Sequence, residues 1–79
     1  SPDGERLLFT VLFDPCGPPD RSSIYRLDVA DGNLVPLVEE DRRVLVAGKW
    51  LSNETAELID AAGAIWRIDV LTRNLRLVE

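Results

Sequence analysis

An internal repeat constrains this chain more than any other feature of its sequence. The segment Ile24–Val29, which reads IYRLDV, returns 41 residues later as IWRIDV at Ile65–Val70. The pair Asn33-Leu34 returns as Asn74-Leu75 at the same spacing. A repeat of this length is typical of a supersecondary unit that is copied along the chain and packs against its neighbours. The sequence therefore predicts two tandem units of one plan, residues 1–40 and residues 41–79.

Upstream of these segments the match continues with a longer spacing. Glu5–Thr10, read as ERLLFT, aligns with Thr55–Asp60, read as TAELID, at an offset of 50 residues. The extra length falls in Asp14–Ser23, where three prolines and one glycine stand in place of the short Ala61–Gly63. Because proline cannot donate to a sheet ladder, we predict a long loop over Asp14–Ser23. This loop is either the best candidate for specific contact or an unstructured decoration.

Each unit carries the residue pattern of β-strands. Leu7–Phe13 is a nearly unbroken run of β-favouring residues, which suits a strand covered on both faces. The repeated segments alternate instead, with a fully apolar face opposite a mixed one. The apolar face holds Tyr25, Leu27 and Val29 in the first copy and Trp66, Ile68 and Val70 in the second.

Turn residues divide the chain into seven predicted strands. Asp31-Gly32 is a strong hairpin signal, since glycine accepts a positive φ and aspartate tolerates it. The following strand contains Pro36, which places it at a sheet edge. The predicted strands are residues 7–13, 24–29 and 34–38 in the first unit, and 42–47, 55–60, 65–70 and 75–79 in the second.

These features resemble the β-propeller repeat of TolB-like proteins, a relative of WD repeats. Ser1–Arg6 resembles the Ser-Pro-Asp-Gly turn of that repeat, Ile24–Asp28 its Ile-Tyr-x-x-Asp strand, and Asp31–Leu34 its last turn. Trp50–Glu54 resembles an altered Trp-Ser-Pro-Asp-Gly that lacks the proline and the glycine. The resemblance implies an all-β fold of antiparallel four-stranded propeller blades. The chain would supply two blades of a propeller, the first without its inner strand.

Two blades cannot close a ring, because propellers are typically built from four to eight blades. Uncovered blade faces recruit partners, so the expected partners are neighbouring blades of the same parent chain or of further copies, with another protein as a further possibility. We therefore expect a non-catalytic interaction or scaffolding module. The alternatives are part of the substrate-gating propeller of a prolyl-oligopeptidase-like serine hydrolase, and a short chain that assembles into a complete ring. A compact seven-stranded sandwich is a minority alternative for the fold.

Composition excludes several classes of function. Fourteen acidic residues against nine basic ones give a net charge of −5, which disfavours binding to nucleic acid. The sequence contains no apolar run of the roughly 20 residues that a membrane-spanning helix needs and no leader peptide, so we expect no membrane contact. One cysteine and no histidine exclude an internal disulfide and argue against a zinc site. We predict no cofactor, and one thiol leaves the compartment open.

No catalytic, cofactor-binding or metal-binding residue is predicted. Arg26 precedes Asp28 by two residues, and Arg67 precedes Asp69 in the same way. Each pair either forms an ion pair on one sheet face or leaves the aspartate to cap the following turn while the arginine stays solvated. The acidic run 39–41, followed by Arg42-Arg43, is interpreted as a solvated connection, because it lacks the ligand series of a calcium site.

The remaining candidate nucleophiles and aromatic residues are given structural roles. Cys16 has no histidine to act as its base, and neither do the serines, so neither a cysteine nor a serine hydrolase site is assembled by this chain. The serines concerned are Ser1, Ser22, Ser23 and Ser52. Tyr25, Trp50 and Trp66 recur with the strand pattern and are interpreted as core residues rather than recognition residues.

Overall fold

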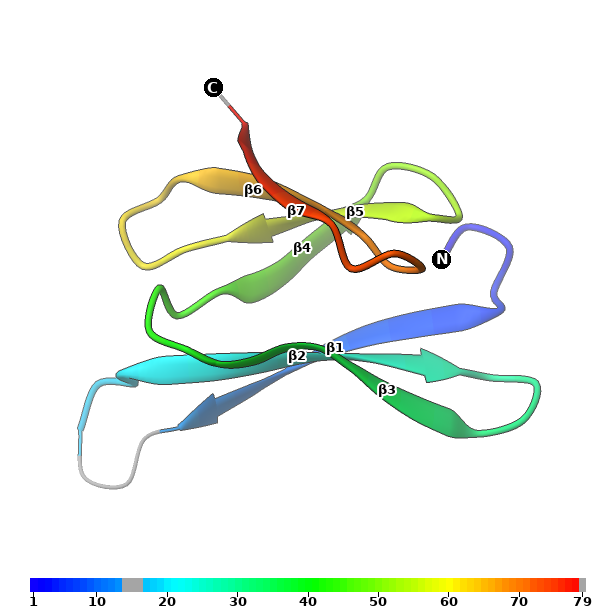
Figure 1. The fold of residues 1–79 in the computed structure, drawn as a ribbon, viewed down its shortest axis with the longest axis horizontal. Coiled ribbons are helices and arrows are strands. Elements are labelled where there is room, and N and C mark those ends of the chain that lie inside the picture. Colours follow the sequence, from blue (N-terminus) through cyan, green and yellow to red (C-terminus); the bar gives the residue numbers. More distant parts are fainter. Residues whose placement is uncertain (14–16, 79) are drawn as a thin grey trace.

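Seven strands form two antiparallel sheets in the computed structural model, which describes residues 1–13 and 17–78 (Figure 1). The first sheet has the order β1-β2-β3, formed by Arg6–Phe13, Arg21–Asp28 and Asn33–Asp41. The second has the order β4-β5-β6-β7, formed by Val46–Trp50, Thr55–Ile59, Ile65–Asp69 and Leu75–Val78. The described residues contain no helix. The predicted all-β class, with three and then four antiparallel strands, is confirmed.

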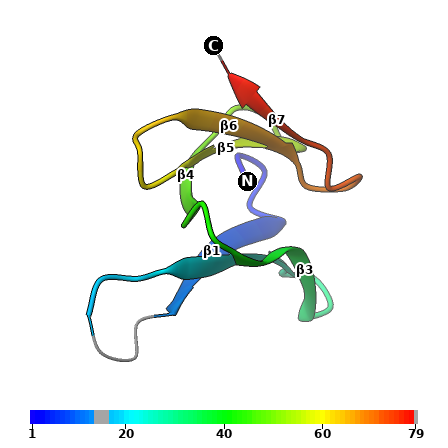
Figure 2. The ribbon, with the colours of Figure 1, turned by 60° about the vertical axis from the view of Figure 1, so that its left-hand side comes forward.

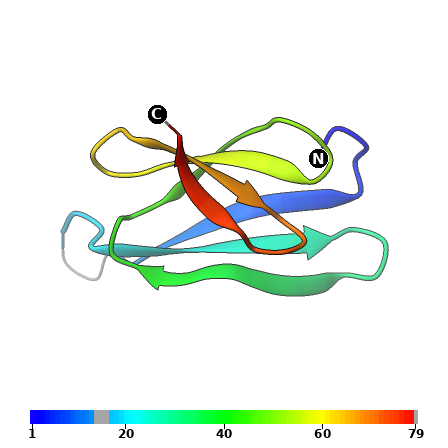
Figure 3. The same cartoon turned by 45° about the horizontal axis from the view of Figure 1, so that its top comes forward.

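The two sheets lie one above the other, and the core sits between them (Figures 1 and 2). Seen obliquely from above, the hairpin of β6 and β7 lies over the first sheet (Figure 3). The buried apolar residues form one cluster to which both sheets and the segment between them contribute. They are Ile24, Leu37, Leu45, Ala56, Leu58, Ile68 and Val70.

The two sheets present different faces to this core. In the second sheet the fully apolar face points inward, so that Ile68 and Val70 are buried. In the first sheet the mixed face of β2 points inward and carries the buried Ile24. Because β2 and β6 are copies of one segment, the two sheets pack through opposite faces of the repeated unit. We call this arrangement head-to-tail stacking. Each sheet therefore leaves outside the face that the other one buries.

Strand pairing corrects the predicted alignment of the first strands of the two units. Arg6 pairs with Asp28, and Thr55 pairs with the equivalent Asp69, so Arg6 corresponds to Thr55 at an offset of 49 residues. The predicted offset of 50 is wrong by one residue. Since side chains alternate along a strand, that slip would have moved every side chain to the opposite face.

The loop predicted over Asp14–Ser23 is shorter than expected. β2 already begins at Arg21, which pairs with Phe13, so Ser22 and Ser23 belong to the strand. Both serines are buried and satisfied by hydrogen bonds: the Ser22 hydroxyl donates to the Leu45 carbonyl over 2.6 Å, and the Ser23 hydroxyl accepts from the Glu40 amide over 2.9 Å. Residues 14–16 of the loop lie outside the described residues.

The strand predicted over residues 42–47 is also displaced, because β4 begins only at Val46. Asp41 holds the preceding segment in a turn by accepting hydrogen bonds from the Arg43 amide and from the Arg43 side chain. The Val44 amide donates to the Asp41 carbonyl, and Val44 has a φ of 55°. That left-handed conformation is incompatible with a strand.

The prediction that the strand with Pro36 lies at a sheet edge is confirmed, whereas the prediction that the first strand is covered on both faces is wrong. β3, which contains Pro36, is an edge strand of the first sheet. β1 was expected to be covered on both faces, but only one of its faces meets the second sheet, and Leu7, Phe9 and Val11 are exposed on the other. β3 ends at Asp41, and the division into a first blade of residues 1–40 and a second of residues 41–79 stays a prediction.

Two repeat-equivalent isoleucines test the head-to-tail stacking. Ile24 is fully buried between the sheets, whereas Ile65 is 39% exposed on the outer face of the second sheet. We expect Ile24→Ala to lower the free energy of unfolding by about 2–5 kcal/mol, because a buried side chain leaves a cavity. Ile65→Ala should cost well under half as much. Urea denaturation under dilute conditions measures both, and equal losses would contradict the stacking.

Candidate functional site

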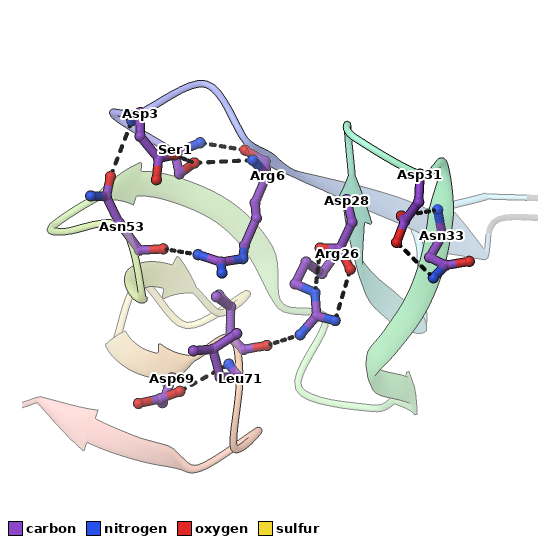
Figure 4. Close-up of polar contacts among 11 residues, drawn as sticks. Ser1, Asp3, Arg6, Arg26, Asp28, Asp31, Asn33, Asn53, Asp69 and Leu71 are labelled. Atoms are coloured by element: carbon purple, nitrogen blue, oxygen red, sulfur yellow. Dashed lines mark hydrogen bonds and ion pairs between the residues drawn. The ribbon is translucent and has the colours of Figure 1, made fainter.

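An arginine from the first sheet joins the two sheets. Nε and Nη2 of Arg26 donate to the two carboxylate oxygens of Asp28 over 2.9 and 3.1 Å (Figure 4). Nη1 of Arg26 donates to the Val70 carbonyl of the second sheet over 2.7 Å. Both side chains of the ion pair are mostly buried. A planar guanidinium can make all three contacts at once, so the pair fixes how the second sheet sits on the first.

A depression of about 190 Å³ adjoins this ion pair and is called the Arg26 depression. Its floor and walls come from the first sheet and the turn after β2, including Arg6, Arg26 and Asp28. Leu71, which follows the Val70 carbonyl acceptor, lines it from the second sheet. The contact therefore consists of a polar anchor and, beside it, an apolar side chain from the neighbouring unit.

The N-terminal turn makes a second contact between the units. The Asp3 amide donates to Oδ1 of Asn53 over 3.1 Å, and Nη1 of Arg6 donates to the Asn53 carbonyl over 3.0 Å (Figure 4). A hydrogen bond from the Ser1 hydroxyl, aided by the Glu5 amide, holds the pKa of Asp3 below its usual value. The turn before β1 thus binds the loop before β5, which resembles it in sequence.

The equivalent pair of the second unit is arranged differently. The Asp69 carboxylate accepts from the amides of Leu71 and Thr72 over 2.9 and 3.0 Å, and these bonds lower the pKa of Asp69, that from Thr72 most. Arg67 is left without Asp69: its buried Nε has no hydrogen-bond partner among the residues that the structure describes. The ion pair predicted as one alternative is therefore found in the first unit, and the aspartate cap of the other alternative in the second, where the arginine expected to stay solvated has a buried Nε.

The turns that follow carry the same kind of cap in both units. Asp31 accepts from the Asn33 amide over 3.0 Å, and Thr72, at the equivalent position, accepts from the Asn74 amide over 3.3 Å. The units differ in the aspartate before the turn, since Asp69 binds the amides of Leu71 and Thr72 whereas Asp28 pairs with Arg26. Side-chain to backbone bonds of this kind are available to aspartate wherever a turn leaves amides unpaired.

A second depression, of about 200 Å³, lies at the equivalent place on the second sheet and is called the Arg67 depression. Thr55, Arg67 and Asp69 line it, and they correspond to Arg6, Arg26 and Asp28. Asn74 and Arg76 complete its wall. The Arg26 depression receives Leu71 from the other unit, whereas the Arg67 depression is lined by residues of its own sheet alone.

The outer face of the first sheet carries a group of apolar side chains that are partly or largely exposed. Phe9 and Tyr25 stack on it with ring centroids 5.6 Å apart. Leu7, Leu27 and Leu34 lie opposite one another across the three strands. This outer face consists of Leu7, Phe9, Val11, Tyr25, Leu27, Leu34 and Pro36. Contiguous apolar surface of this kind marks an interaction site.

The three aromatic candidates separate into two groups. Trp50 and Trp66 pack against the core, as predicted. Nε1 of Trp66 donates to Asp60 over 3.0 Å, and this bond, with backbone amides, lowers the pKa of that carboxyl. The Arg43 guanidinium lies 4.4 Å from the centroid of the Trp66 ring. The prediction of a core position is wrong for Tyr25, which lies on the outer face of the first sheet and stacks on the exposed Phe9.

The remaining candidates are used structurally or lie outside the described residues. Ser52 accepts from the amides of Glu54 and Thr55, and Glu40 and Asp41 of the acidic run pair with Arg21 and Arg43. Over residues 1–13 and 17–78, no group of three potential metal ligands comes together. A search of the same residues finds no helix with the length and apolar character to span a bilayer. Cys16 lies outside the described part of the chain.

The chain was compared with protein-family models, with curated proteins and with solved structures, and none of the three comparisons returned a significant match. Its function must therefore be argued from its own sheets and contacts.

The anchoring role of Arg26 can be tested by a conservative change. We expect Arg26→Lys to lower the free energy of unfolding by about 1–3 kcal/mol, since an ammonium cannot bind Asp28 and the Val70 carbonyl in the same way. The matched control, Arg67→Lys, should change it by no more than about 0.5 kcal/mol in the dilute chain. Chemical denaturation measures both, and equal effects would contradict an anchor specific to Arg26.

Acid should destabilise the fold through its hydrogen-bonded aspartates. The pKa values of Asp3, Asp41, Asp60 and Asp69 lie below the ordinary value of 3.8, so the folded state binds protons less readily than the unfolded one. Their stabilisation is present above this value and is lost as the pH falls through the folded pKa values. We expect the free energy of unfolding to decrease from about pH 5 to pH 2. Asp60→Asn should flatten that profile in urea titrations, and a wild-type profile without acid dependence would contradict the assignment.

Proposed function

We propose that this chain is a non-catalytic protein-interaction or scaffolding module, formed by two blades of a TolB-like β-propeller, and that the outer face of its first sheet binds another β-sheet. One observation carries the proposal. The face that the first sheet leaves exposed at Leu7, Phe9 and Val29 is buried in the second sheet at the equivalent residues Ala56, Leu58 and Val70.

The repeat makes this comparison quantitative. Phe9 corresponds to Leu58, and the exposed fractions are 38% and 0%. Val29 corresponds to Val70, and here they are 51% and 0%. Burying an apolar side chain contributes about 25 cal/mol per Å², so covering this face would outweigh an exposed ion pair. The second sheet shows what such cover looks like, because its equivalent face packs on a strand layer of the same chain.

A binding role also agrees with the chemistry of the side chains. The chain contains no histidine, and the hydroxyls of Ser22 and Ser23 are committed to backbone groups in the interior. A place in the gating propeller of a prolyl-oligopeptidase-like hydrolase would use the same stacked sheets. No contact among the described residues favours that role over the non-catalytic one, so we retain the simpler proposal.

Charge substitution on the outer face tests the proposal. The chain should associate as its concentration rises, because the exposed face is apolar, and the double variant Phe9→Glu, Leu34→Glu should sediment as a monomer. Both residues are exposed, so the changes should leave the fold intact, which circular dichroism checks. Sedimentation velocity over a concentration series measures the mass.

Leu51→Glu is the matched control, since Leu51 is an exposed leucine in the loop between β4 and β5, away from this face. It should associate like the wild type. Wild-type chain that stays monomeric at every concentration, or a control that dissociates as fully as the double variant, would contradict the proposed binding face.

A further inference from the structure

The contact between the two units of the chain indicates how a further unit could bind to the second sheet. Within the chain, the corner after β6 sits on the first sheet: the Val70 carbonyl accepts from Arg26, and Leu71 lines the Arg26 depression. The corner after β2 has the same plan, with Val29 and Ala30 at the equivalent positions. Val29 is exposed, and no described residue donates a backbone hydrogen bond to its carbonyl oxygen.

The second sheet has a depression equivalent to the one that receives Leu71 on the first sheet. No described residue of another unit lines it. Arg67 corresponds to Arg26 and lines a depression of similar volume. Its Nε is buried without a hydrogen-bond partner among the described residues, although burying an unsatisfied donor is costly. A carbonyl placed like that of Val70 would accept from Nη1 of this guanidinium, as at Arg26, where Nε is bound by Asp28 instead.

Charge complementarity favours the corner after β2 as the occupant. Arg67 lies between Glu57 on β5 and Arg76 on β7, and the like charge of Arg76 directly opposite it is unfavourable in a sheet. The two arginines line the depression, where Asp69 is already bonded to turn amides. The corner after β2 carries the exposed Asp31 beside Ala30. An acidic corner and a basic depression are therefore placed where the repeat would bring them together.

The size of the corner suits the depression. Ala30 stands where the existing contact has the larger Leu71. The two depressions have similar volumes of about 190 and 200 Å³, so the Arg67 depression has room for the smaller side chain. The surfaces that flank the contact agree as well, because the outer face of the first sheet would cover the outer face of the second sheet around Ile65.

We propose that the Arg67 depression binds the Val29–Asp31 corner of a second copy of this chain, with the Arg67 guanidinium donating to the Val29 carbonyl, so that copies stack head to tail. The proposal rests on the proposed function and specifies the occupant of the binding face. Such contacts are heterologous, because the surface used on one copy differs from the surface used on the next.

Single substitutions test the two halves separately. Arg67→Glu should weaken self-association in sedimentation by about tenfold or more, because it removes the donor and places an acid against Asp31. Arg42→Glu is the control: it makes the same charge change at an exposed arginine between the sheets and should associate like the wild type. If the two variants behave alike, the Arg67 depression is not the binding site.

Mixing two blocked variants distinguishes this arrangement from other modes of association. Phe9→Glu removes the binding face of the first sheet and Arg67→Glu that of the second, so each alone should sediment as a monomer. Their mixture retains one intact pair of surfaces and should form a 1:1 dimer and nothing larger. A mixture that stays monomeric overturns the head-to-tail contact.

The two proposals fail in different ways. If Phe9→Glu dissociates the assembly while Arg67→Glu matches its control, the binding face of the proposed function stands and the Arg67 contact is wrong. If neither variant changes the assembly, both are wrong. A wild-type chain that never associates also overturns both.

Discussion

The whole structure depends on one asymmetric contact, in which the apolar face of the second sheet packs on the mixed face of the first. Arg26 makes this contact specific, since it binds Asp28 within its own sheet and the Val70 carbonyl across the interface. Apolar burial alone is non-directional and would tolerate several orientations of one sheet on another. A bidentate ion pair with a third donor left for the neighbour selects one of them.

The asymmetry of this contact also determines what the surface of the molecule can do. If the two sheets had met through matching faces, the apolar faces would have covered each other and the chain would have ended as a closed sandwich. Head-to-tail stacking instead repeats the same donor and acceptor surfaces at the two ends of the stack. A module of this kind has an uncovered surface at each end, so the proposed binding to a further sheet would follow from its fold and would need no separate site.

The sequence predicted the parts of the fold that depend on local chemistry. Alternation in the repeated segments located β2 and β6, and Pro36 correctly assigned β3 to an edge. The offset of the first strands failed because residues 7–13 are apolar on both faces, so a one-residue slip against Thr55–Asp60 leaves a plausible alignment. Which partner Asp28 and Asp69 bind could not be decided either, because a carboxylate beside a turn can accept from an arginine of its own strand or from turn amides, and the two turns carry equivalent caps at Asp31 and Thr72.

The chain connection between the two sheets explains why the proposed contact between two copies would rely on side chains. Within the chain, Asp41 holds Arg43 in the turn after β3, and the Arg43 carbonyl accepts from the Ala61 amide of the second sheet. Glu40 and Val44 adopt left-handed conformations that such residues rarely take, so the connection is closely determined by its surroundings. This connection therefore helps to position the second sheet on the first, in addition to the contact made by Arg26. A separate copy would lack this connection, and its position would depend entirely on the apolar face and on groups such as Arg67, which is why a single charge reversal there is expected to weaken association.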